Sequence, residues 1–132
     1  MGAYVLDTSA LLAMREGEAG SDRVHRLIAS AHKRRSVVYL SFMSRMELLY
    51  CVSASEGEHA AIEALRLVDS FPVRWVTCEP SILVEAARIK ASGRLSVADA
   101  WIAATARLHD AVLIHKDPEY LSVQDLKQEM IG

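Results

Sequence analysis

The sequence has little of the material that marks unusual classes of protein. Two cysteines among 132 residues are too few for a disulfide framework and favour a reducing compartment, the cytosol. Three prolines and six glycines exclude a loop-dominated or collagen-like chain. With 52% hydrophobic and 24% charged residues, the chain is too apolar to be disordered. We therefore expect a single compact domain over residues 1–132.

Signals for membrane insertion and export are also missing. No apolar run approaches the roughly 18 residues that a membrane span needs. The opening MGAYVLD has no basic segment and only a short apolar stretch, so we expect neither a signal peptide nor a membrane partner. The net charge is −2, so no general excess of basic residues advertises nucleic acid, although a local site remains compatible with an RNA partner.

Apolar periodicity predicts alternating strands and helices. Continuous apolar runs at residues 4–6, 37–40 and 111–114 are typical of strands that are covered on both faces, and residues 73–76 alternate between apolar and polar as a fourth strand. Apolar residues recur at helical spacing between these runs. The helical stripes comprise Val24, Leu27, Ile28 and Ala31; Ala61, Leu65 and Val68; Ile82, Ala86 and Ile89; and Val97, Trp101, Ala104 and Leu108. The pattern predicts an α/β fold with a mostly parallel central sheet flanked by helices.

Four acidic residues are candidate site residues, and two of them stand where such a fold places its sites, beyond the carboxyl ends of the strands. Asp7 directly follows the first predicted strand, and Asp117 comes shortly after the last. Glu47 and Asp99 are expected in the first turns of helices. Each acid also has a structural interpretation, because Glu47 and Asp99 end S-x-x-E and S-x-x-D patterns of the capping-box type. Asp7 is equally suited to cap a helix, and Asp117 to begin a turn.

Convergence of the four acids would require a counter-charge. Two unit charges about 5 Å apart repel by roughly 3 kcal/mol at an effective dielectric constant of 20. The acid motifs do not each contain a lysine or arginine that would neutralise them. Mg²⁺ and Mn²⁺ prefer oxygen ligands, and helix N-termini also favour ionised carboxylates. Four converging acids therefore predict a divalent metal site.

The ordered motifs resemble those of the PIN-domain ribonucleases, in particular the small VapC-type toxins of toxin–antitoxin modules. The resemblance rests on V-L-D-T-S at 5–9, S-x-x-E at 44–47, G-R-L-S-V-A-D-A-W-I-A-A-T-A at 93–106 and L-I-x-x-D at 113–117. It implies a PIN-like three-layer fold. It also implies a catalytic metal site formed by Asp7, Glu47, Asp99 and Asp117.

The same resemblance implies a function. An endoribonuclease of this family would use Mg²⁺ or Mn²⁺ to activate the water that attacks the scissile phosphate, and would leave 5′-phosphate and 3′-hydroxyl ends. An antitoxin partner and a homodimer are the family expectations for a small PIN protein. Surplus apolar residues at 43–52 agree with a protein partner, because they exceed what one helical stripe requires.

Five neighbouring residues are candidate auxiliaries. By the resemblance, Ser9 forms a hydrogen bond within the metal site; its alternative is to cap the next helix. His115 stands where the family usually has Thr or Ser, so it replaces that hydroxyl as a donor, approaches the metal or points aside. Glu119 lies where the family often has a second acid. Arg45 and Arg94 either contact phosphate or pair with a neighbouring acid.

Other interpretations stay open from the sequence. A catalytically weak PIN scaffold that binds protein or RNA would carry similar motifs. Phosphoaspartyl enzymes also place an acid after the first strand, but Ser9 stands where they typically have a second aspartate. The basic cluster at residues 32–35 is expected to be a solvated helix end rather than an RNA contact.

Overall fold

The computed structural model describes all residues, 1–132, as an alternating series of strands and helices. The elements are β1 (Gly2–Leu6), α1 (Thr8–Glu16), α2 (Ser21–His32), β2 (Ser36–Ser41), α3 (Met43–Glu56), α4 (Glu58–Asp69), β3 (Arg74–Val76), α5 (Pro80–Ser92), α6 (Val97–Leu108), β4 (Val112–His115), the 3₁₀ helix η1 (Pro118–Ser122) and β5 (Gln128–Met130). Each of the four predicted strands is present, although β3 and β4 begin one residue later than the predicted segments at 73 and 111.

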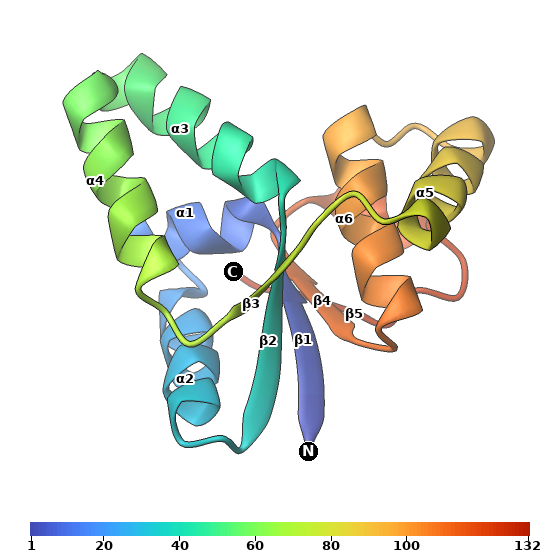
Figure 1. Cartoon of the computed structure of the whole chain (residues 1–132), viewed down its shortest axis with the longest axis horizontal. Helices are drawn as coiled ribbons and strands as arrows, with labels where there is room; N and C mark the ends of the chain where they lie inside the picture. Colours follow the sequence, from blue (N-terminus) through green and yellow to red (C-terminus); the bar gives the residue numbers. More distant parts are fainter.

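The strands form one parallel sheet in the order β3-β2-β1-β4-β5. The central strand β1 pairs with β2 on one side and with β4 on the other, where Leu6 lies opposite Ile114. Helices α1 to α4 lie on one side of the sheet, and α5 and α6 lie on the other (Figure 1). The three layers confirm the expected α/β fold.

Successive residues of the central strands pack into two different cores. Leu6 and Ile114 belong to an apolar cluster shared with α1 to α4, whereas Val5 and Leu113 belong to a cluster shared with α5 and α6. All four side chains are 0% exposed. Because successive strand side chains point to opposite faces, a sheet covered on both faces needs apolar residues at every position. This explains why the runs are continuous.

The predicted apolar stripe of α6 is wrong at its two ends. Val97 is 57% exposed and Leu108 is 44% exposed, while Ala104 is fully buried. The helix packs against the sheet and α5, so it buries a wide arc rather than a single stripe. Four alanines line this arc together with Ile102 and allow close packing: Ala100, Ala103, Ala104 and Ala106. Half-buried Trp101 packs its ring edge against Phe42, with 5.1 Å between ring centroids.

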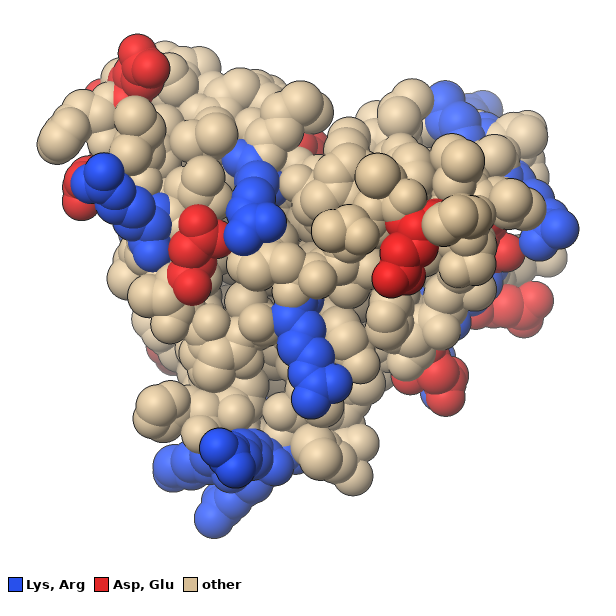
Figure 2. Space-filling view, in the orientation of Figure 1, with Lys and Arg blue, Asp and Glu red and all other residues tan.

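The parallel strands separate two ends of the molecule. Acidic positions follow the carboxyl ends of β1 and β4, whereas the basic residues 33–35 precede β2 at the amino ends. Figure 2 shows basic side chains gathered at this amino end of the molecule. The 32–35 cluster therefore lies away from the acids, in agreement with a solvated helix end. None of the helices is both long enough and apolar enough to cross a membrane.

Helices α3 and α4 form a hairpin that extends past the carboxyl end of the sheet (Figure 1). Gly57 separates them with a φ of 94°, a conformation that residues with a Cβ rarely adopt. In the space-filling view the surface is notched between this hairpin and the α5–α6 pair (Figure 2). The carboxyl ends of β1 and β4 point toward this part of the molecule, so the fold directs their acids between the two helical layers.

Candidate active site

Asp7 is the most buried acid of the group, with 4% exposure. Both of its carboxylate oxygens are hydrogen-bonded: Oδ2 accepts from the Ser9 backbone at 2.9 Å and from the Ser9 hydroxyl at 2.5 Å. Oδ1 accepts from the Tyr120 hydroxyl at 2.6 Å. Asp7 also caps the N-terminus of α1, so the capping interpretation and the site interpretation hold together. These bonds fix the carboxylate at the end of β1.

Ser9 links the two strand ends. Besides donating to Asp7, its hydroxyl accepts a 3.0 Å hydrogen bond from the backbone N–H of Lys116. It therefore lies within the acidic group, where the resemblance places it, and the cap of α1 is Asp7 instead.

Asp99 reaches the same region from α6. Ser96 caps this helix by accepting from the Asp99 backbone at 3.1 Å, which is half of the expected capping box. The Asp99 carboxylate instead contacts the Tyr120 hydroxyl at 3.0 Å. Burial and the nearby charge of Asp7 raise the pKa of Asp99 to about 6. This raised pKa shows that the Asp99 carboxyl is both buried and close to other negative charge.

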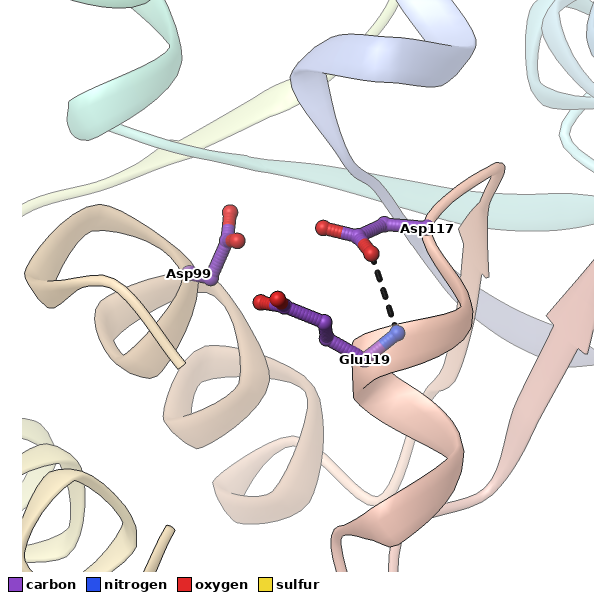
Figure 3. A group of neighbouring side chains, drawn as sticks. All are labelled: Asp99, Asp117 and Glu119. Atoms are coloured by element: carbon purple, nitrogen blue, oxygen red, sulfur yellow. Dashed lines mark hydrogen bonds between the residues drawn. The ribbon is translucent and has the colours of Figure 1, made fainter. Parts of the chain in front are cut away.

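Asp99, Asp117 and Glu119 form the tightest acidic group. One oxygen from each lies within 4.8 Å of the others, and their side chains point toward one another in Figure 3. Asp117 caps η1 by accepting the Glu119 backbone N–H at 2.9 Å. The turn that Asp117 begins is therefore what returns Glu119 toward Asp99. The structure places the candidate auxiliary Glu119 inside the group.

Glu47 faces this group from α3 but stands apart from the tight trio. Its carboxylate accepts a 2.7 Å hydrogen bond from the Thr8 hydroxyl, which also lies 3.0 Å from the Ser44 hydroxyl. Burial raises the pKa of Glu47, the Thr8 hydrogen bond opposes that rise, and the Asp7 charge adds to it. Asp7 and Glu47 thus act on each other electrostatically across the space between α1 and α3.

The expected first-turn position of Glu47 is wrong. Helix α3 begins at Met43 after Phe42, which makes no side-chain cap, so Glu47 lies beyond the first turn. Ser44 is consequently inside the helix, and its hydroxyl is a neighbour of Thr8 rather than a cap. A helix N-terminus supports only Asp99 in the way that was expected for both acids.

His115 is fully buried on β4, and both ring nitrogens are occupied. Its Nδ1 accepts the backbone N–H of Asp117 at 3.1 Å, which leaves Nε2 to donate to the Gln128 side-chain oxygen at 2.9 Å. The ring therefore supports the backbone at Asp117. Of the three alternatives for His115, the geometry matches the last: the ring points aside, accepting at the Asp117 backbone and donating to Gln128 rather than to an acid of the site.

The two candidate arginines differ in their surroundings. Arg45 pairs with Asp69 at 2.9 Å and stacks on the Trp75 ring at 3.7 Å, so its partner is not Glu47. Arg94 makes no ion pair and lines a pocket between α5, α6 and η1, where Arg88 and Arg107 are neighbours. Arg45 is thus held by Asp69 and Trp75, whereas Arg94 pairs with no neighbouring acid.

Tyr120 is the residue that the sequence reasoning missed. Burial, followed by the charges of Asp7 and Asp99, raises the pKa of its phenol, so the hydroxyl stays protonated and donates. One signal points to it: residues three apart eclipse in a 3₁₀ helix, so a residue three after Asp117 returns to the same side. Thr8 and Gln128 were also missed, because their roles depend on contacts distant in sequence.

The donor set fits a hard divalent cation. Asp7, Glu47, Asp99, Asp117 and Glu119 supply only carboxylate oxygens. No lysine or arginine forms an ion pair with any of these five acids. Mg²⁺ and Mn²⁺ take oxygen ligands, and the group itself contains no cysteine or histidine that would favour a softer metal.

Comparison with known proteins agrees with this arrangement. The family model of the PIN domain matches residues 4–126. The toxin–antitoxin complex VapBC2 of Rickettsia felis, solved with a promoter DNA fragment, has 16% identity and a TM-score of 0.79, covering 98% of this chain and 99% of that one. VapBC-1 of nontypeable Haemophilus influenzae has 23% identity and a TM-score of 0.70, covering 97% of both chains.

VapC20 of Mycobacterium tuberculosis, described as a toxin that cleaves the sarcin–ricin loop, has 19% identity and a TM-score of 0.73, covering 98% of this chain and 99% of that one. At these identities the solved structures show a common fold. No curated protein sequence matches this chain.

Proposed function

Because the chain belongs to the PIN-domain family, we propose that it is a metal-dependent endoribonuclease that hydrolyses RNA with Mg²⁺ or Mn²⁺. The observation that carries this proposal is the gathering of five acids without a basic partner at the carboxyl ends of β1 and β4. Like charges are held together here at a cost, which a catalytic site for a cation explains.

The acids would surround the ion from both helical layers. Asp99, Asp117 and Glu119 would hold the ion from the α6 and η1 side, and Asp7 from the end of β1. A bound divalent ion lowers the pKa of its water and offsets charge on the phosphate. Glu47 closes the opposite side from α3, where Thr8 orients its carboxylate.

We further propose that the protein is the toxin of a type II toxin–antitoxin module. Its fold matches those of VapBC complexes from several bacteria. Exposed apolar side chains on α3 and α4 offer a surface for an antitoxin or a second copy: Met46, Tyr50, Ile62 and Leu67. Partner proteins bury such side chains at the centre of an interface.

A cleavage assay on a mixture of structured RNAs tests the catalytic proposal. We expect cleavage with Mg²⁺ or Mn²⁺, none with a chelator, and 5′-phosphate ends on the products. Asp7→Asn combined with Asp99→Asn should abolish it. Asp110→Asn is the matched control, because Asp110 is an exposed acid beyond the other end of α6, with a φ of 49° that asparagine tolerates.

Two outcomes would contradict the proposal. Cleavage that persists in the double variant would point to a contaminating nuclease. RNA binding without cleavage at any metal concentration would favour a scaffold that only binds.

A further inference from the structure

Tyr120 occupies an unusual place for a tyrosine on a short surface helix. It is 0% exposed, and its hydroxyl lies between Asp7 at 2.6 Å and Asp99 at 3.0 Å. These two acids are 92 positions apart in the sequence and come from different elements, the end of β1 and α6. A single phenol therefore connects the two acids that the proposed metal site needs to bring together.

The two acids depend on this hydroxyl unequally. Asp7 keeps two hydrogen bonds from Ser9 whether or not Tyr120 is present. The Tyr120 hydroxyl has one proton, which the two carboxylates share, and this shared contact is the only hydrogen bond made by the Asp99 carboxylate. Loss of the hydroxyl would therefore free Asp99, which the charge of Asp7 would repel, while leaving Asp7 in place.

The ring that carries the hydroxyl is itself held in place. It packs on the His115 ring with 4.7 Å between centroids. Gln128 donates from its amide to the Tyr120 backbone carbonyl at 2.9 Å and accepts from His115 at 2.9 Å. One glutamine of β5 thus fixes the His115 ring and the Tyr120 backbone, and the packed rings give the phenol a defined position relative to the acids.

We propose that Tyr120 is a positioning residue of the metal site, whose hydroxyl holds Asp99 beside Asp7 in the orientation that a divalent ion requires. The inference rests on the proposed function, since it concerns the same acids. Hydrogen bonds from outside the ligand set commonly orient ligating groups, and their loss lowers metal affinity 10- to 100-fold. A carboxylate oxygen can accept one hydrogen bond and still bind a metal with its other lone pair.

Calorimetric titration of the full chain with MnCl₂ tests the proposal. Tyr120→Phe removes only the hydroxyl, and we expect the Kd for Mn²⁺ to rise about tenfold or more. Tyr39→Phe is the matched control, because Tyr39 is a half-buried tyrosine of β2 that packs on His109 and donates to none of the acids. We expect its Kd to be unchanged.

A double-mutant cycle distinguishes positioning from a general loss of structure. If Tyr120 acts through Asp99, adding Tyr120→Phe to Asp99→Asn should change the Mn²⁺ affinity less than threefold. Fully additive losses would overturn the proposal. An unchanged or tighter Kd in Tyr120→Phe would also overturn it, because the hydroxyl would then be neutral or in competition with the ion.

The electron paramagnetic resonance spectrum of bound Mn²⁺ and the melting temperature in chelator complete the experiment. We expect an altered spectrum and a folded Tyr120→Phe protein; an unfolded variant would show a role in the fold rather than in the site. If the wild-type chain itself binds no Mn²⁺, the metal-dependent function fails together with this inference. If the wild type binds and the variant binds equally, only the inference fails.

Discussion

The hydroxyl of Thr8 donates a 2.7 Å hydrogen bond to the carboxylate of Glu47, which lies 39 residues later in the chain. This bond joins the first residue of α1 to the middle of α3 and orients the only acid that faces the site from the hairpin. It also lowers the pKa of Glu47 against the effects of burial and of the Asp7 charge.

Thr8→Val should therefore make RNA cleavage more sensitive to acid. Without the hydroxyl, the pKa of Glu47 rises further, so a higher pH is needed to ionise it. We expect the acidic limb of the rate–pH profile to move to higher pH and the maximal rate to fall by about tenfold. Thr105→Val is the control, since Thr105 donates only to the Trp101 carbonyl. An unmoved acidic limb would show that Glu47 does not control the rate.

In the metal-free protein, Asp99 should contribute a loss of stability as the pH rises from about 4 to 7. Burial and Asp7 raise the folded-state pKa of Asp99 from 3.8 to about 6, so the folded chain binds this proton more tightly than the unfolded chain. The contribution is complete below the unfolded pKa and is lost as the pH passes the folded pKa. Urea denaturation in chelator across this range measures it. Asp99→Asn should flatten the dependence; an identical slope in that variant would contradict the assignment.

His115→Thr should destabilise the protein by about 2–3 kcal/mol. The substitution leaves a cavity beside Tyr120 and leaves Gln128 without its partner, and both effects lower the free energy of unfolding. Chemical denaturation measures the loss, with the half-buried His109→Thr as a control that should cost less. Equal stability of His115→Thr and the wild type would mean that threonine restores the support at Asp117.

RNA binding should depend on the metal and weaken with salt. Without the acids Asp7, Glu47, Asp99 and Asp117, the chain has 13 of its 17 acidic residues against 15 basic ones, so these four alone decide the sign of the net charge. We expect a short single-stranded RNA to bind more tightly with Mg²⁺ than with chelator, and less tightly as KCl rises. The combined Asp7→Asn and Asp99→Asn variant should bind equally well or better without metal. Fluorescence anisotropy measures both proteins, and an equal, salt-insensitive affinity of the wild type in both conditions would contradict this mechanism.

The parallel core was predictable because its strands are apolar at consecutive positions. Strand β5 was not, since its Gln-Glu-Met sequence contains no apolar run and pairs only at the edge of the sheet. The apolar stripe predicted for α6 was wrong at its ends because the alanines of this helix, rather than Val97 and Leu108, face the interior. Side-chain size thus hid the packed face of this helix.

The acids of the site were predictable from their place at strand ends and in helices, but their connections were not. Hydrogen bonds such as that from Tyr120 to Asp7 join residues more than a hundred positions apart. Such pairs cannot be predicted from the local sequence pattern. Helix α3 starts directly after β2, where Ser41 rather than Ser44 accepts a backbone N–H of the first turn, so Glu47 lies further along its helix than predicted. His115 gained its role from Gln128, a residue on the strand that the sequence did not reveal.

Val5 and Leu6 pack into different cores, so the register of β1 also fixes the direction of the Asp7 side chain. Asp7 follows these residues directly, so an insertion or deletion of one residue in β1 would exchange the cores' side chains and turn Asp7 away from Ser9 and Tyr120. Such a change would damage folding and the acidic site in the same step. Surface loops tolerate changes of length, but any change in the length of β1 would affect both the two cores and the position of Asp7.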